Sequence, residues 1–500
     1  MTSTSIRPLL AFTPNQGWLN DPNGQFYDRE TKTWHLYYQY YPDDIVWKTP
    51  LYWGHATSKD LSTWEDHGVA LGPDNPDEGV FTGNIVIDYD NTSGFFDSNT
   101  HPSRRVVAIY TYEKKNSQTQ YIAYSLDGGY TFVKYSNNPV LDVNSLNFRD
   151  PKVFWHLPTK QWIMVIAKTQ EFKVEIYGSL DLKSWKLHSS FSSGIYGFQY
   201  ECPSLVEVPI ENTRDTKWVM IVAINPGLPL GGSANQYFVG SFDGYLFIAD
   251  DSQARLMDYG KDFYAFQVFE NTTPDQGVIG LAWASNWQYA HVAPTSSWRG
   301  SMTLPRKLTL ALRKVNPDTS VLSLLQEPVY GKSVLDAQVV QKRDIHLATT
   351  NTVKMDKISS GTFLFDITFK IDESIKTNGL LQITFGNKGV NESVRSGFDL
   401  STKQFFVDRS NASGLKENPF FTDKTSAYVD PLTKVGNSSV YKFLGIIDGN
   451  LIEIYLNNGI VTLTNTFFLE GGVGPDYLKV STTCDDIHLI DLKVCELKLR

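Results

Sequence analysis

A turn unit that recurs four times restricts the fold of this chain more than any other feature. Each copy has a Ser, an Asp two positions later, and an aromatic residue four or five positions after the Asp. The copies start at Ser58, Ser125, Ser179 and Ser241, at separations of 67, 54 and 62 residues. The short polar side chains bond nearby backbone amides and reverse the chain. Strand-like runs precede the turns: Trp34–Tyr40, Val106–Tyr112, Trp162–Ala167 and Trp218–Ile224. Repeats of this size with four strands each are typical of a β-propeller.

The extent of the repeats predicts five blades. Residues 1–55 and 258–298 are strand-rich as well, although the second segment lacks the turn unit. All 12 tryptophans lie between Trp18 and Trp298, which marks this part as one unit. We therefore predict an all-β chain in which residues 1–313 form a five-bladed β-propeller. A β-sandwich with four similar hairpins is the alternative.

Strict alternation of apolar and polar residues characterises the last third of the chain. It is clearest in Phe363–Ile371 and in Ile452–Leu456, the second of which precedes an Asn458-Gly459 turn. Half-buried antiparallel strands with tight turns indicate a β-sandwich. We predict this sandwich at residues 336–500, after a linker at 314–335.

Length and composition exclude several classes of function. The 500 residues exceed the ~250–300 at which one core stops growing, so two domains are expected. No apolar run approaches the ~18 residues of a membrane helix, and we expect no membrane partner. The net charge of −9 argues against a nucleic acid partner. The sequence has no His-x-x-x-His or Cys-x-x-Cys motif, and we expect neither a metal nor a cofactor.

Asn-x-Ser/Thr sequons indicate the secretory pathway. The candidate glycosylation sites are Asn91, Asn271, Asn391, Asn411 and Asn437. No signal peptide is visible, so we expect a secreted or cell-wall protein whose leader is absent from this sequence. Three cysteines are too few for a disulfide scaffold. A bridge between Cys484 and Cys495 would need an intervening turn, because their odd separation points them to opposite faces of a strand.

Three carboxylates stand in dense motifs where the first, third and fourth repeats begin. These are Asp21 in Trp18–Gly24, Asp150 in Phe148–Pro151 and Glu201 in Tyr200–Pro203. Innermost propeller strands converge on the axis, so these residues can meet in one funnel. Taken singly, the motifs also suit a turn, a surface ion pair and the start of a strand. Their joint placement among aromatic residues favours a sugar ligand, and a carboxylate pair is the minimum that glycoside hydrolysis requires.

Together with Phe81-Thr82-Gly83, these motifs resemble the signatures of glycoside hydrolase family 32, in particular its invertase-type β-fructofuranosidases. The resemblance covers essentially the whole chain and includes Trp53–Ser58, Asn235–Gly240 and Trp283–Trp287. It implies a five-bladed β-propeller with the site in its funnel, followed by a β-sandwich. It also implies cleavage of terminal β-D-fructofuranosyl units from sucrose and short fructans, and fructosyl transfer when a sugar replaces water.

The resemblance assigns roles residue by residue. Asp21 corresponds to the nucleophile, Glu201 to the general acid/base and Asp150 to the transition-state stabiliser. A retaining mechanism then implies carboxyl groups ~5–5.5 Å apart. We expect a raised pKa for Glu201, and an Arg149 that keeps Asp150 ionised. The positions that match the family's sugar pocket are Asn20, Gln39, Trp47, Phe81, Thr82, Arg149 and Trp287, with Gln199 and Asn225 further out. Trp47 and Trp287 also suit ordinary packing.

Several alternatives stay open. A fructan-preferring exo-inulinase or a fructosyltransferase would use the same residues, and three departures from the family pattern (Tyr41, Thr82 and Asn147) bear on that choice. Ser125–Phe132 resembles the Asp-box of sialidases, but no triple-arginine site with a Tyr nucleophile accompanies it. A non-catalytic carbohydrate-binding propeller is the alternative of another class. The resemblance also implies a homodimer or larger homo-oligomer.

Overall fold

The computed structural model describes residues 6–227, 231–316, 319–374, 378–485 and 487–500. These residues form seven β-sheets and six short 3₁₀ helices, which confirms the prediction of an all-β chain. The 3₁₀ helices are η1 (Pro102–Arg104), η2 (Thr169–Glu171), η3 (Ala290–Val292), η4 (Ser413–Leu415), η5 (Asn457–Gly459) and η6 (Glu470–Gly472).

Five sheets, here called the ring sheets, make up the first part of the chain. The first contains β1 (Gly17–Asp28), β2 (Thr33–Tyr41), β3 (Tyr52–Ser58), β4 (Trp64–Leu71) and β20 (Trp298–Arg299). The second contains β5 (Gly79–Ile87), β6 (Val106–Lys114), β7 (Ser117–Ser125) and β8 (Val133–Lys134). The third contains β9 (Phe148–His156), β10 (Gln161–Lys168), β11 (Lys173–Ser179) and β12 (Lys186–Phe191). The fourth contains β13 (Tyr200–Pro209), β14 (Thr216–Ile224), β15 (Ala234–Phe242), β16 (Phe247–Ala249) and β17 (Arg255–Leu256). The fifth contains β18 (Tyr264–Val268), β19 (Val278–Trp283), β21 (Arg306–Asn316) and β22 (Thr319–Pro328).

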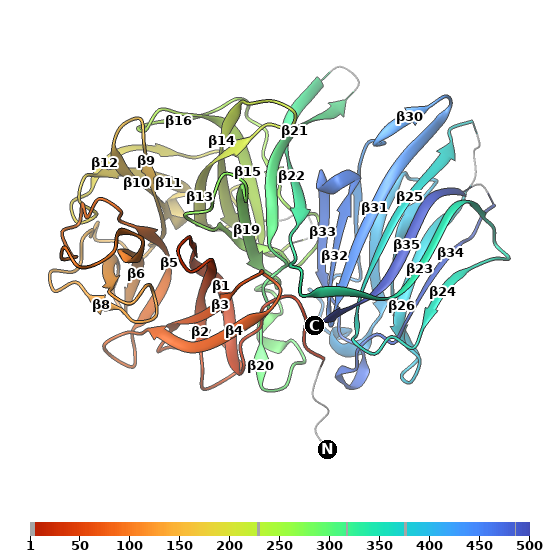
Figure 1. Cartoon of the computed structure of the whole chain (residues 1–500), viewed down its shortest axis with the longest axis horizontal. Coiled ribbons are helices and arrows are strands. Elements are labelled where there is room, and N and C mark those ends of the chain that lie inside the picture. The colour runs from red at the N-terminus through yellow and green to blue at the C-terminus, as the bar shows by residue number, and fades with distance from the viewer. Residues whose placement is uncertain (1–5, 228–230, 317–318, 375–377, 486) are drawn as a thin grey trace.

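The first strands of the ring sheets surround a common axis. β1, β5, β9, β13 and β18 contact one another in this order, and β18 contacts β1 again. The ring sheets, red to green in Figure 1, lie on the left of that view. A parallel bridge between Phe26 and Glu270 joins the ends of the first and last of these strands. The start of each first strand therefore lies at one end of the ring and its last residues at the other.

The recurrent turn unit connects the third and fourth strands of the first four ring sheets, as its sequence predicts. In the first sheet the Ser58 hydroxyl accepts the Leu61 N–H at 2.8 Å, and Asp60 Oδ1 accepts the N–H groups of Ser62 and Thr63 at 3.0 Å. Trp64 then begins β4. Asp127, Asp181 and Asp243 bond the backbone in the same manner in the next three sheets.

The linker expected at 314–335 is mostly a part of the fifth ring sheet. β21 extends to Asn316, and β22 pairs with it along its whole length from Thr319 to Pro328. The next strand begins at Val334, so only residues 329–333 connect the two parts of the chain. The loosened sequence pattern therefore marks a hairpin rather than a linker.

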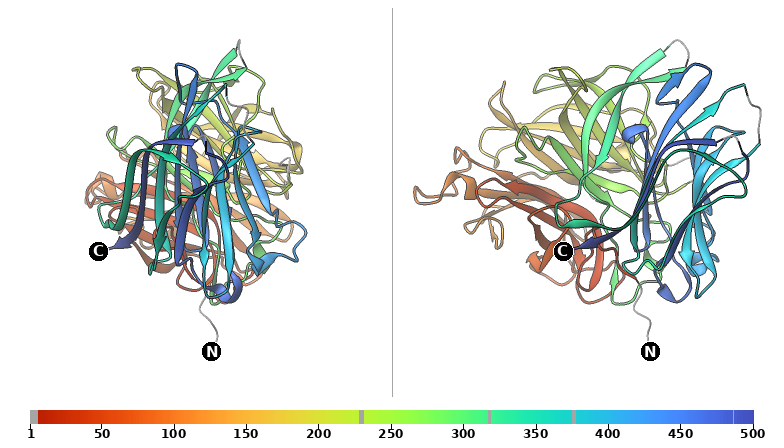
Figure 2. Two further views of the ribbon diagram at one scale, coloured as in Figure 1. Left: turned by 90° about the vertical axis from the view of Figure 1, so that its right-hand side faces the viewer. Right: turned by 45° about the vertical axis from the view of Figure 1, so that its right-hand side comes forward.

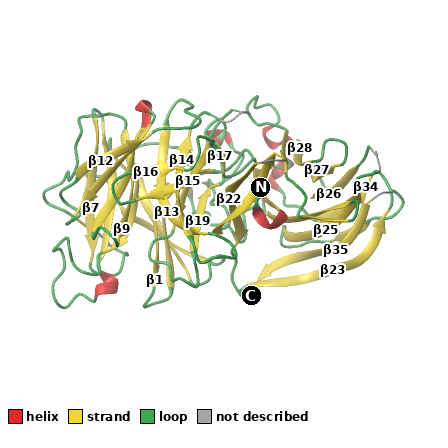
Figure 3. Ribbon diagram, turned by 90° about the horizontal axis from the view of Figure 1, so that it is seen from above, coloured by secondary structure: helices red, strands yellow, loops and turns green. Residues whose placement is uncertain are grey.

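Two larger sheets, here called the C-terminal sheets, follow. One contains β23 (Val334–Leu347), β35 (Ile487–Leu499), β25 (Thr362–Asp372), β31 (Ser438–Asp448), β32 (Leu451–Leu456), β33 (Val461–Thr466) and β30 (Thr433–Val435). The other contains β24 (Val353–Asp356), β34 (Tyr477–Thr482), β26 (Leu380–Asn387), β27 (Glu392–Asp399), β28 (Gln404–Asn411) and β29 (Lys424–Tyr428). They share one apolar core, to which the alternating residues of β25 and β32 contribute as expected. Seen from above, they lie beside the ring (Figure 3).

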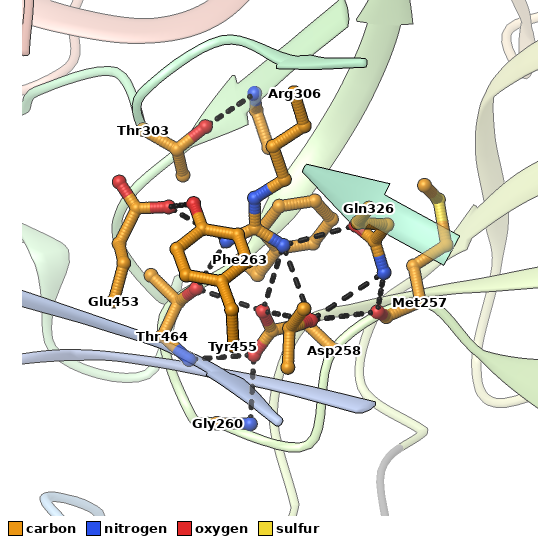
Figure 4. A network of polar contacts seen from close by, with 12 residues as sticks. Met257, Asp258, Gly260, Phe263, Thr303, Arg306, Gln326, Glu453, Tyr455 and Thr464 are labelled. Carbon is orange, nitrogen blue, oxygen red and sulfur yellow. Dashed lines mark hydrogen bonds and ion pairs between the residues drawn. The ribbon is translucent and has the colours of Figure 1, made fainter. Parts of the chain in front are cut away.

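A buried polar network connects the ring to the C-terminal sheets. Arg306 on β21 forms ion pairs with Asp258 of the ring at 3.0 Å and with Glu453 on β32 at 2.7 Å, and all three side chains are almost fully buried (Figure 4). Thr464 on β33 accepts a hydrogen bond from the same guanidinium at 2.6 Å. The turned views of Figure 2 keep the green strands of the fifth ring sheet beside the blue C-terminal sheets. The two parts are therefore held together by charges as well as by packing.

Two properties of the chain can be read directly from the fold. Cys202, Cys484 and Cys495 are free and buried, so a bridge between the last two is not formed. Within the described ranges, no helix combines the length and apolarity that crossing a bilayer requires.

Candidate active site

Each first strand of the ring carries a β-bulge near its start. In every case two residues face one residue of the second strand: Asn20 and Asp21, Phe81 and Thr82, Asp150 and Pro151, Cys202 and Pro203, and Ala265 and Phe266. A bulge bends the strand and re-aims its side chains. Asp150, Cys202 and Ala265 also have positive φ angles of 67°, 43° and 53°, a strain that gathers at functional sites. Five bulges thus present side chains to one end of the ring.

Asp21 is bonded through only one of its carboxylate oxygens. Oδ2 accepts the Thr82 hydroxyl at 2.8 Å and the Cys202 thiol at 3.5 Å. Oδ1 is buried and has no hydrogen-bond partner among the described residues. Burial, followed by the charge of Glu201, raises the pKa of Asp21 to about 6. One oxygen of this carboxylate is therefore left for a ligand.

Glu201 is held from both sides. Its Oε1 accepts hydrogen bonds from Arg149 Nε at 3.1 Å and Nη2 at 2.9 Å, and its Oε2 accepts the Tyr264 hydroxyl. Arg149, Glu201 and Tyr264 are the residues that precede the bulges of three successive ring sheets. The equivalence of these positions explains why the three side chains meet. Tyr264 is absent from the sequence-based site because no motif marks it.

Asp150 shares a partner, Cys202, with Asp21. Cys202 links it to Asp21, because the Cys202 N–H donates to Asp150 Oδ2 at 2.9 Å and the thiol lies 3.6 Å from that oxygen. Burial raises the pKa of Asp150 to about 7, against the opposing charge of Arg149, and Glu201 and Asp21 raise it further. Arg149 pairs with Glu201, and its charge lowers the pKa of Asp150 less than burial raises it, so Arg149 does not bring that pKa below its ordinary value.

Most of the other predicted pocket residues lie on the first ring sheet and around it. Asn20 accepts the Trp18 indole N–H at 2.8 Å, and Gln39 on β2 faces the bulge that contains Asp21. The amide oxygen of Gln39 is buried and without a partner in the described part of the chain. Trp47 contacts Phe81 edge-to-face, with ring centroids 6.2 Å apart.

A second group lies on the fourth ring sheet and beyond. Gln199 accepts a hydrogen bond from Arg149 at 3.3 Å, which places it next to Glu201. The Ser233 hydroxyl donates to Asn225 Oδ1 at 3.1 Å and accepts the Trp287 N–H at 3.2 Å. Ser233 thereby joins two predicted residues that are far apart in sequence. It was not predicted, since an isolated serine carries no motif.

Known proteins match the chain over its whole length. Residues 11–328 match the Glycosyl hydrolases family 32 N-terminal domain, and residues 333–493 match the Glycosyl hydrolases family 32 C terminal. The chain belongs to glycoside hydrolase family 32. This membership confirms the resemblance to family 32 that the short motifs indicate. The chain is accordingly a glycoside hydrolase.

Relatives in family 32 have similar lengths. The extracellular exo-inulinase of Meyerozyma guilliermondii is 63% identical over 500 residues, which cover 100% of this chain and 97% of that protein. The invertase of Debaryomyces hansenii is 54% identical over 507 residues, covering 99% and 94%. The structure of β-fructofuranosidase from Schwanniomyces occidentalis complexed with fructosyl-erythritol superposes with a TM-score of 0.96 at 50% identity, over 99% of this chain and 98% of that one.

The three departures from the family 32 pattern have different surroundings. Thr82 keeps the hydroxyl that bonds Asp21. Asn147 donates to the exposed Gln170 side chain at 3.4 Å. Tyr41 ends β2 and packs against the core of the first ring sheet. Only the first of these positions contacts an acid directly.

Proposed function

We propose that this family 32 enzyme is a retaining β-fructofuranosidase that releases terminal fructosyl units from sucrose and short fructans. Ionised Asp21 attacks the anomeric C2 of the fructosyl unit while Glu201 protonates the departing glycosidic oxygen. Glu201 then takes a proton from the water that hydrolyses the fructosyl–Asp21 ester. Asp150, beside both, bonds sugar hydroxyls and stabilises the positive charge of the transition state.

The free Oδ1 of Asp21 is the observation that carries the proposal. A nucleophile needs one oxygen without a partner, and Thr82 fixes the other oxygen of this carboxylate. The nearby amide oxygen of Gln39, likewise unpartnered within the described residues, suits a sugar hydroxyl. Glu201 needs a partner in both protonation states, and the Tyr264 hydroxyl can donate to the carboxylate or accept from the acid.

The substrate range is tested by product analysis. Chromatography of reactions with sucrose, 1-kestose and inulin should show fructose from the first time point. An exo-inulinase preference is the second candidate, favoured by the name of the 63% identical relative. Faster fructose release from inulin than from sucrose would establish that preference. Binding of fructosides without any release of fructose would instead favour the alternative of a non-catalytic carbohydrate-binding propeller.

We infer that the ring sheets are the five blades of a β-propeller and the C-terminal sheets a β-sandwich. The cyclic contacts of the first strands support the first assignment, and the shared core supports the second. The boundaries that suit both are a propeller up to residue 328 and a sandwich from residue 334.

Secretion and oligomerisation are further parts of the proposal. The 63% identical relative from Meyerozyma guilliermondii is an extracellular exo-inulinase. Asn391, Asn411 and Asn437 are exposed and suit glycan attachment, whereas Asn91 and Asn271 are half-buried. Mass spectrometry of tryptic glycopeptides tests each site. We propose a homodimer or larger assembly, and a monomeric mass in light scattering would contradict it.

A further inference from the structure

A cavity of about 430 Å³ lies at the end of the ring opposite the three carboxylates. Its walls come from the late parts of the first strands, from residues that follow them, and from the second strands β10, β14 and β19. Six residues define its chemistry: Trp155, Trp162, Glu207, Trp218, Glu270 and Asn271. The catalytic acids stand in the early bulges of the same strands, so the two sites face opposite ends of one axis.

A buried layer separates this rear cavity from the catalytic pocket. Lys152, 1% exposed, donates to Asn84 Oδ1 and to the Val268 carbonyl, each at 2.9 Å. It also forms an ion pair with Glu270 in the cavity wall at 2.7 Å. Because these groups bond one another across the axis, the ring is not an open channel at this level. The rear cavity is a site of its own.

The lining of the rear cavity fits a neutral ligand with apolar faces and hydroxyl groups. Trp155 and Trp218 are half-buried, and Trp155 contacts Trp162 with ring centroids 5.1 Å apart. Of the charged residues that line the cavity, Glu270 forms an ion pair with Lys152 of the separating layer, and Arg29 and Glu207 carry opposite charges, so the wall has no excess charge that would select an ion. Pockets that combine aromatic surface with a few polar groups are suited to small ligands of this volume. We propose that the rear cavity is a second carbohydrate-binding site, in which a sugar ring lies against tryptophan.

One source of such a sugar is the chain itself. Asn271 begins the sequon Asn271-Thr272-Thr273 and lines the rear cavity. Arg29 donates to the carbonyls of Asn271 and Thr272 at 2.9 and 2.7 Å, and the Tyr89 hydroxyl donates to Asn271 Oδ1 at 3.0 Å. An N-glycan at this position would start at the cavity wall. The other source is a free fructo-oligosaccharide, such as the substrates of the proposed function.

Calorimetric titration of protein made without glycans distinguishes the sources. N,N′-diacetylchitobiose represents the core of an N-glycan, and 1-kestose represents the fructans. The titrated protein carries Asp21→Ala so that it does not turn over the second probe. Chitobiose binding at one site supports the glycan as ligand, and 1-kestose binding at two sites supports a free fructan. In either case Trp155→Ala weakens the cavity site by about tenfold, equal to about 1.4 kcal/mol.

Tyr245→Ala is the matched control, because Tyr245 is exposed on the ring and lies outside the cavity. Should Trp155→Ala fail to fold, Glu207→Gln tests the same wall through an exposed, isosteric change with the same expected weakening. Sucrose hydrolysis by Trp155→Ala with Asp21 intact stays at the wild-type rate, which separates this inference from the proposed catalysis. No chitobiose binding together with a single 1-kestose site would overturn it.

Discussion

At the scale of the residue, the proposed mechanism depends on the free oxygen of Asp21. We expect Asp21→Ala to lower kcat at least ~10³-fold with the fold intact, as for removal of a nucleophile. Initial rates of fructose release from sucrose measure this loss. The exposed Asp77→Asn is the control and should keep the wild-type rate. Substantial activity of Asp21→Ala would assign the nucleophile elsewhere.

In the proposed mechanism, Tyr264 acts through Glu201 as a positioning residue. We expect Tyr264→Phe to lower kcat by about tenfold with little change in KM, because one hydrogen bond to a charged group contributes ~1.5–3 kcal/mol. The alkaline limb of the pH–rate profile should move to higher pH, since the carboxylate form of Glu201 loses a donor. A purely structural role would lower the rate without moving that limb, and Tyr245→Phe should do neither.

Asp150 makes stability depend on pH. Its pKa is raised from 3.8 to about 7 in the folded state, so its contribution to stability is present below pH 4 and is lost as the pH rises through 7. We expect Asp150→Asn to match the wild type in urea denaturation at pH 4. At pH 8 the variant should be more stable than the wild type, because it carries no buried charge at this position. A variant that is less stable at pH 8 would show that the ionised carboxylate is stabilised rather than strained.

Short motifs revealed some of these residues and not others. Asp21, Asp150 and Glu201 stand in dense motifs that remain visible in the sequence alone. Tyr264 and Cys202 act through contacts between sheets, which local sequence does not encode. The burial that raises the pKa of Asp150 likewise depends on the surrounding sheets, which local sequence does not encode.

At the scale of the element, the bulges decide which side chains face the ring axis. Gly83 follows the bulge in β5, where a Cβ atom would lie 2.3 Å from the Ile109 carbonyl oxygen. We expect Gly83→Ala to cost ~1–3 kcal/mol of stability through overpacking. The same substitution should displace Thr82 and break its hydrogen bond to Asp21, which should lower kcat about tenfold, as expected for one lost hydrogen bond to a charged group. Thermal unfolding and sucrose assays measure the two effects.

Gly94→Ala is the control that separates a loss of stability from a loss of activity. Gly94 has a positive φ of 65°, but a Cβ atom there meets nothing within 4 Å. We expect a loss of ~1–2 kcal/mol from backbone strain with full activity. Equal losses of activity in both variants would contradict the role given to the bulge.

Sequence patterns locate four of the ring sheets more clearly than the fifth. The turn unit located the ends of four sheets because its hydrogen bonds are local. The fifth sheet has no such unit, and β21 pairs with β19 across residues 284–305. The hairpin between β21 and β22 carries Asn316-Pro317-Asp318, of which the last two lie outside the described residues, and such turn residues also suit a linker.

At the scale of the whole molecule, the buried network around Arg306 joins the ring to the C-terminal sheets. We expect Arg306→Met to destabilise the protein by ~3–5 kcal/mol, because Asp258 and Glu453 would remain buried without their partner. Calorimetry should show a lower Tm for this variant. Arg343→Met, which breaks an exposed pair, should leave Tm almost unchanged. Similar Tm values for the two variants would show that the network does not stabilise the contact between the ring sheets and the C-terminal sheets.

The central claim is that Asp21 and Glu201 act on one sugar from opposite sides through a covalent intermediate. Glu201→Gln should allow attack on a fructoside with a good leaving group, which needs little acid assistance, and should slow hydrolysis of the ester. Peptide mass spectrometry of the quenched reaction tests this directly. The account predicts one added fructosyl unit on the peptide that contains Asp21. A label on the peptide that contains Asp150, or fructose release without any labelled peptide, would contradict it.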